Sequence, residues 1–178
     1  MGLRAYGVTV VAAAAALWTM SGTQREKPLL AATEPEAVRV LETQVVANPN
    51  DPAATRALAQ AYLDAREPGL AVVLFESANA AVRDDVRVQH VYARALIDEG
   101  RNDDALRVER GVVAACRPLT EGAPAPTGCD GVLFASAVRR TEILSELLAL
   151  GVEDAQAHPE VSFAAYQNAT REARVMVQ

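Results

Sequence analysis

An internal repeat within residues 52–117 is the feature that most constrains the fold of this chain. Ala59 recurs as Ala93, and Ala71 recurs as Ala105, each 34 positions later. A repeat of this length, with helical apolar spacing in both halves, is typical of stacked antiparallel helical hairpins, because one hairpin cannot bury its apolar face alone. The repeat therefore predicts an all-α solenoid of such hairpins.

The composition agrees with helices that pack closely. Hydrophobic residues make up 51% of the 178 positions, enough to build a core, but aromatic residues make up only 4% and alanine is abundant. Alanine is the best helix former and its small side chain lets two helices approach each other. The net charge of −6 argues against a general nucleic-acid binder, which needs a basic face to neutralise phosphates.

The apolar spacing also predicts where the helices lie, beginning with one over Glu34–Ala47. Asp85 and Asp130 are placed to cap two of the later helices through their side-chain oxygens. In the helix after Asp130, the stripe from Val132 to Leu148 is expected to face inward, as is Tyr166 in the last helix. The other expected ranges are about 52–65, 69–82, 130–150 and 159–176, with two more helices between 86 and 116.

Several residues within these helices match the signature of the tetratricopeptide repeat, and the chain resembles that family over roughly Glu34 to Arg117. The second hairpin departs at Glu109 and Val112, where an aromatic residue and an alanine are usual. An unrelated antiparallel helical bundle is the alternative. The matching residues are Leu58, Ala59, Tyr62, Ala71, Phe75 and Ala78 in the first hairpin, and Ala93, Gly100 and Ala105 in the second.

The resemblance implies a concave groove, lined by the first helix of each hairpin, that holds a peptide or a helix of another protein. Its arginines could then pair with carboxylates of that partner. The carboxylate-clamp pattern of the family is not reproduced in full, because its asparagines are absent. The alternative is a solvated face whose arginines pair locally with acidic neighbours. The groove-side residues expected to bind the partner are Arg56, Gln60, Arg87, His90 and Arg94.

No catalytic constellation is recognisable along the chain, so we expect no enzymatic activity, no cofactor and no metal site. His90 and His158 are isolated in sequence, and an enzyme would require that folding supplies them with partners. Ser136 has no nucleophile-elbow context. Arg140, beside Arg139, is expected to be plain surface.

The first residues form an uncharged, mostly apolar run from Ala5 to Gln24, preceded by Arg4 and followed by Arg25. The run is long enough to span a bilayer, and Trp18 fits an interfacial position. A cleaved signal peptide and a buried helix are the alternatives to the uncleaved anchor that we favour, since a small-residue cleavage site is poorly matched. The predicted organisation is a signal or anchor segment at 1–24, a linker at 25–32 and a helical domain at 33–178.

Two cysteines, the only ones in the chain, bracket its only long loop, which is rich in proline and glycine. Cys116 and Cys129 are therefore predicted to form a disulfide across residues 117–128, which requires an oxidising compartment. Two free thiols in a cytosolic protein are the alternative. The expected location is thus the membrane or the periplasm, on the extracytoplasmic side.

These patterns together predict a non-enzymatic scaffold, exported or membrane-anchored, that binds another protein through a concave helical groove. The alternative is a structural or oligomerising subunit of an envelope complex that uses no such groove. The sequence identifies neither the partner nor the oligomeric state.

Overall fold

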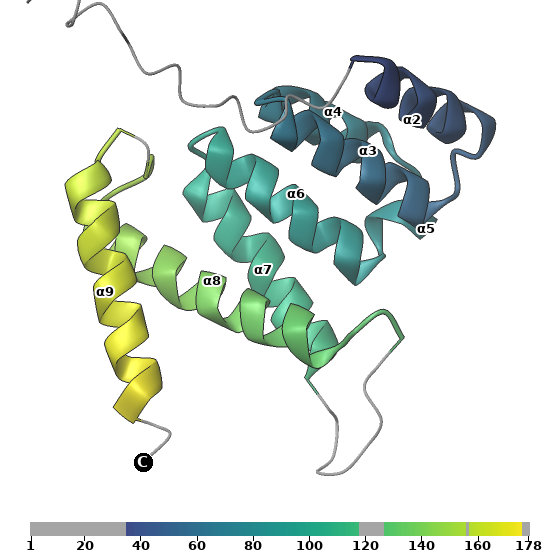
Figure 1. Ribbon diagram of the computed structural model, residues 1–178. Helices are drawn as coiled ribbons and strands as arrows, with labels where there is room; N and C mark the ends of the chain where they lie inside the picture. Colours follow the sequence, from purple (N-terminus) through teal and green to yellow (C-terminus); the bar gives the residue numbers. More distant parts are fainter. Residues whose placement is uncertain (1–34, 118–126, 156, 176–178) are drawn as a thin grey trace, which may run out of the picture. The chain divides into compact units, whose positions relative to one another are not determined.

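A computed structural model of the protein describes residues 35–117, 127–155 and 157–175, all within the unit Thr33–Gln178 (Figure 1). These residues form helices and no strand, which confirms the all-α prediction. The predicted anchor and linker, residues 1–32, lie outside the described residues. The helices are α2 (Pro35–Ala47), α3 (Pro52–Asp64), α4 (Pro68–Ser77), α5 (Ala80–Arg83), α6 (Val86–Asp98), α7 (Asn102–Cys116), α8 (Gly131–Ala149) and α9 (Pro159–Val175).

Two aspartates that the sequence marked as caps begin helices of the structure. Asp85 accepts hydrogen bonds from the backbone N–H groups of Arg87 and Val88, at 2.9 and 3.0 Å, and so caps α6. Asp130 caps α8 by accepting from the N–H of Leu133 at 2.8 Å. Both caps were predicted from the sequence. Each satisfies backbone donors that the first turn of a helix leaves unpaired.

The helix predicted over residues 69–82 is instead broken into α4 and α5, so that prediction was wrong in its detail. Asn79 causes the break. Its side-chain oxygen accepts from the N–H of Val82 at 3.1 Å, and its Nδ2 donates to the carbonyl of Pro49 at 2.6 Å. An asparagine side chain that bonds in this way competes with the helical backbone ladder and starts a new helix.

Small side chains fill the contacts between helices. The four alanines that define the repeat are all buried, with at most 5% of their surface exposed. Their neighbours in the main core include Leu96, Leu106 and Leu144, which are also buried. Helices consecutive in the chain pack against each other, and Figure 1 shows α6 and α7 lying side by side with α8 crossing beside α7. The repeated alanines thus mark buried positions between helices.

The predicted disulfide between Cys116 and Cys129 is present, with 5.4 Å between the two Cα atoms. It ties the end of α7 to the residues just before α8. A smaller apolar cluster surrounds it and contains Val86, Val112 and Ala137. Such a bond is characteristic of an oxidising, extracytoplasmic compartment. Among the helices of the described ranges, none is long and apolar enough to cross a bilayer.

Some residues expected to face inward are exposed, Val132 and Tyr166 among them. Val132 is 81% exposed, because Leu133 and Ala137 rather than Val132 set the face of α8 that packs toward α7. Tyr166 is 44% exposed and accepts a hydrogen bond from Arg139 at 2.7 Å. The Arg139 guanidinium also lies 5.1 Å from the centre of the Tyr166 ring, a cation–π distance. The exposure of Val132 and the packing of Leu133 show that the apolar stripe of α8 begins one residue later than predicted.

Candidate functional site

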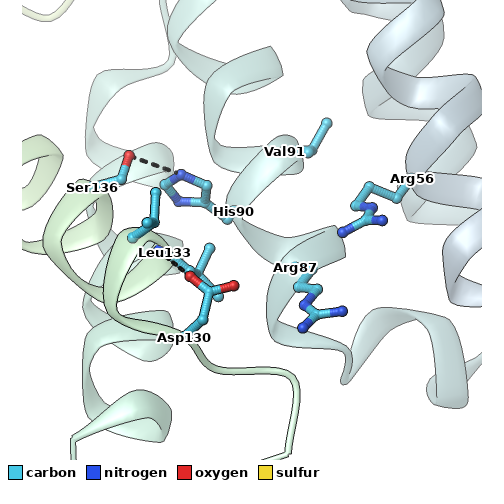
Figure 2. Close-up of a pocket in the computed structure, with 8 residues that line it drawn as sticks. Arg56, Arg87, His90, Val91, Asp130, Leu133 and Ser136 are labelled. Atoms are coloured by element: carbon cyan, nitrogen blue, oxygen red, sulfur yellow. Dashed lines mark hydrogen bonds between the residues drawn. The ribbon is translucent and has the colours of Figure 1, made fainter.

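A pocket of about 580 Å³ opens between α3, α6 and α8. Three of the five residues predicted to bind a partner line it, namely Arg56, Arg87 and His90. Figure 2 shows the two arginines extending from α3 and from the start of α6, on the side of the pocket away from Ser136. The remaining lining residues are Val91, Asp130, Val132, Leu133 and Ser136.

The two arginines have nitrogen atoms available for a ligand. Arg87 donates from Nε to the carbonyl oxygen of Gly128 at 2.9 Å, which fixes the side chain and leaves its terminal nitrogens without a partner among the described residues. Arg56 has no hydrogen bond or ion pair to any described residue. Among the described residues, Asp130 is the one carboxylate in the lining, and one of its oxygens already caps α8. The lining therefore has an excess of positive charge.

The other two predicted groove residues lie away from the pocket. Gln60 donates from Nε2 to Asp64 at 2.8 Å, within its own helix α3. Arg94 is exposed on α6 and does not line the pocket. The structure thus brings together only part of the set that the sequence predicted, because the pocket opens near the start of α6, where Arg87 and His90 lie.

One wall of the pocket is backed by a buried charged cluster that the sequence did not predict. The side chain of Glu109, on α7, is fully buried. Its two oxygens lie 2.9 and 3.0 Å from Nδ1 of His90. Arg140, on α8, donates from Nη1 to the same carboxylate and also, at 2.9 Å, to the backbone carbonyl of His90. Three helices, α6, α7 and α8, therefore meet at one carboxylate.

The hydrogen-bond partners of His90 indicate which ring nitrogen carries the proton in the neutral imidazole. Nδ1 faces the carboxylate of Glu109, so it carries the proton and donates. Nε2 is then the acceptor, and it lies 3.1 Å from the hydroxyl oxygen of Ser136, which donates to it (Figure 2). The side chain of His90 is 15% exposed, so it is neither solvated nor isolated. The hydroxyl of Ser136 and the imidazole of His90 both line the pocket.

Pairing is what makes the burial of Glu109 tolerable. A carboxylate removed from water costs several kcal/mol unless a cation and hydrogen bonds compensate for the lost hydration. Arg140 supplies that cation, with 21% of its side chain exposed. The prediction that Arg140 is plain surface was therefore wrong: the partner that draws it inward is 31 residues away in the chain.

The departure from the repeat pattern at Glu109 was the signal available in the sequence. Glu109 falls in the apolar stripe of α7, between Ala105 and Val112, both of which are buried. A carboxylate in such a stripe requires a partner. The stripe does not say which residue that is, and Ser136 and Arg140 come from the next helix.

No cluster of histidine, cysteine and acidic side chains within residues 35–117, 127–155 and 157–175 has the geometry to hold a metal ion. His158 is exposed, away from the charged cluster. The chain matches no protein-family model, no curated protein and no solved structure, so the chemistry of this pocket has to be argued from its own residues.

Proposed function

We propose that this protein is a tetratricopeptide-like scaffold of stacked helical hairpins that binds an acidic segment of another protein in the pocket between α3, α6 and α8. The observation that supports this proposal is the pair Arg56 and Arg87, whose terminal nitrogens face the pocket without partners in the described residues. A guanidinium presents a planar fork of donors that matches a carboxylate.

The position of the arginines favours a carboxylate over a neutral ligand. An arginine that folding leaves without a counter-ion, at a concave site, retains its attraction for an anion that arrives from outside. Arg87 is also held in place by Gly128, so less side-chain entropy is lost when it binds a ligand. Aspartate or glutamate side chains of a partner protein are the anions that fit this description.

The proposed location is the extracytoplasmic side of a membrane, either tethered by residues 1–24 or released after cleavage. The disulfide between Cys116 and Cys129 supports an oxidising compartment. A bound partner would then be another exported protein, or the exported part of a membrane protein.

A fluorescein-labelled hexaglutamate peptide tests the binding proposal by fluorescence anisotropy at low salt. The double variant Arg56→Glu and Arg87→Glu should weaken binding by at least about tenfold, because hydrogen bonds to charged groups contribute on the order of 1.5–3 kcal/mol each. Arg94→Glu is the matched control, since Arg94 is exposed on the same helix as Arg87 but lies outside the pocket.

Equal affinity for the wild type and the double variant would refute the proposal, as would an equal loss in the Arg94 control. Far-UV circular dichroism should be unchanged in all three proteins, because none of these side chains is in the core.

An oligomerising subunit is the second candidate, and exposed apolar side chains favour it. Val73 and Leu70 of α4 are 61% and 48% exposed, and Val46 of α2 is 81% exposed. Exposed apolar side chains of this kind can take part in protein association. Concentration-dependent sedimentation without a ligand, abolished by Val73→Lys, would support this candidate over the groove.

A further inference from the structure

We infer that Ser136, His90 and Glu109 form a nucleophile–base–acid triad that hydrolyses carboxylic esters bearing an anionic group. This activity goes beyond partner binding and departs from the sequence-based expectation that the chain is not an enzyme. Its preference for an anionic substrate rests on the proposed anion-binding role of Arg56 and Arg87, whereas the triad itself does not.

The distances match the roles. The hydroxyl of Ser136 lies 3.1 Å from Nε2 of His90, within reach for the imidazole to take its proton. Nδ1 of the same ring lies 3.0 Å from Oε2 of Glu109, which fixes the tautomer and stabilises the imidazolium that forms. A triad of this kind is recognised by geometry rather than by the order of residues in the chain.

The burial of the three groups follows the same logic. The acid is fully buried, the base is 15% exposed and the nucleophile lines the pocket, so solvent reaches the reacting end first. Arg140 acts as a positioning residue, since it donates a hydrogen bond to the carboxylate of Glu109 and does not line the pocket. The chain from Ser136 to Glu109 thus ends on a buried carboxyl group that is paired with Arg140.

The partner of Ser136 lies on another helix, which distinguishes this hydroxyl from that of Thr141. A serine within a helix usually satisfies its hydroxyl by bonding to a carbonyl one turn earlier. Thr141, on the same helix, does so: its hydroxyl donates to the carbonyl of Ala137 at 2.8 Å. The hydroxyl of Ser136 instead points across to α6, to a residue 46 positions away.

The pocket has room and charge for a small ester. Its volume of about 580 Å³ is within the range of small-molecule sites. The guanidiniums of Arg56 and Arg87 are the cationic donors in its lining. They lie across the pocket from Ser136 (Figure 2), where they would bind an anionic group on the substrate.

The reaction uses only the ester and water. The hydroxyl oxygen of Ser136 forms a bond to the carbonyl carbon, and its proton moves to Nε2 of His90. The ester C–O bond then breaks, and the leaving alcohol takes that proton. A water molecule attacks the acyl-serine and gives a proton to His90. The bond between the acyl carbon and Ser136 then breaks, and the serine oxygen takes the proton back.

A fluorophosphonate probe tests the triad on the full chain with its disulfide intact. Attack by Ser136 forms a P–O bond and releases fluoride, and peptide mass spectrometry locates the adduct. We expect labelling at Ser136, lost in Ser136→Ala and at least about a hundredfold slower in His90→Gln, because general-base assistance is worth about 10²–10⁴ in rate.

Ser145→Ala is the matched control, because Ser145 lies on the same helix, is similarly half-buried and lies outside the pocket lining. No labelling of the folded wild type, or labelling that survives Ser136→Ala, would overturn the proposal. Because Ser136→Ala removes one oxygen from a helical, half-buried position, loss of labelling in that variant does not reflect unfolding, and circular dichroism verifies this.

The anionic preference has its own readout. Release of p-nitrophenol should be faster from p-nitrophenyl hemisuccinate than from p-nitrophenyl butyrate, and Arg56→Gln should remove the difference. Equal rates on the two esters would overturn the assigned substrate class. The binding proposal is tested separately. If hexaglutamate does not bind but Ser136 is still labelled, the acidic-partner proposal is refuted and the triad proposal is not.

Discussion

Replacing Glu109 by alanine should destabilise the protein by about 3 kcal/mol. Removing one partner of a buried ion pair costs about 3–5 kcal/mol, because the remaining charge stays buried without compensation. The lower end applies here, since Arg140 is 21% exposed and can turn partly toward water. His90 would in addition lose the acceptor of its Nδ1 proton.

This loss is a large share of the free energy of unfolding, because single domains are stable by only about 5–15 kcal/mol. Urea unfolding followed by far-UV circular dichroism measures it: with a slope of about 1.5 kcal/mol per molar, the midpoint should fall by about 2 M. Glu142→Ala, which removes a half-buried carboxylate of α8 with no partner in the described residues, should change the stability by no more than about 0.5 kcal/mol.

Glu109→Gln separates charge from shape. The amide keeps the volume and can still accept from Arg140, so it should cost less than alanine. Its nitrogen must donate to Nδ1 of His90, however, and this forces the proton onto Nε2 and reverses the hydrogen bond with Ser136.

A cost below about 1 kcal/mol for Glu109→Ala would refute the reasoning, because the carboxylate would then be hydrated rather than buried.

Three further results are expected. Reducing the disulfide between Cys116 and Cys129 should lower the free energy of unfolding by about 3 kcal/mol in the chain-entropy model. If intact mass spectrometry finds that the cysteines are alkylated only after reduction, the disulfide is present in the native protein. The hydrogen bond from Arg101 holds the pKa of Asp104 below its ordinary value, so the stability that this pair contributes is present above the pKa of Asp104 in the unfolded chain and is lost as the pH falls through its pKa in the folded protein. Arg101→Gln should raise the pKa of Asp104 in a carboxyl NMR titration, and an unchanged pKa would contradict this prediction. Asn79→Ala should cost about 1 kcal/mol in urea unfolding, because α5 loses its cap, and a neutral effect would count against that cap.

The sequence predicted the helical class because helix formation and amphipathic packing are local properties. The 34-residue interval between Ala59 and Ala93 marked positions that are indeed buried, and Asp85 and Asp130 begin helices as their capping chemistry requires. The cysteine pair was also predictable, since a single loop separates its members. In each case the residues that interact are close in the chain or related by a fixed interval.

The sequence predicted the pocket only in part. Arg56, Arg87 and His90 were predicted to share one face of the helices, and all three line the pocket. Arg94 shares the same helix but lies beyond the pocket, because the width of the opening depends on where α8 crosses, which no local pattern encodes.

The charged cluster was decided by tertiary structure alone. Glu109 stood out as a carboxylate in an apolar stripe, and burial physics required a partner for it, but helical spacing could not say which cation would supply it. Arg140 and Ser136 reach the cluster because α8 packs across α6 and α7, which sets contacts between residues 31 and 46 positions apart. The sequence by itself thus determined helices, caps and the disulfide, since those depend on near neighbours. The meeting of Ser136, His90 and Glu109 depends on how three helices pack, so only the folded chain decided it.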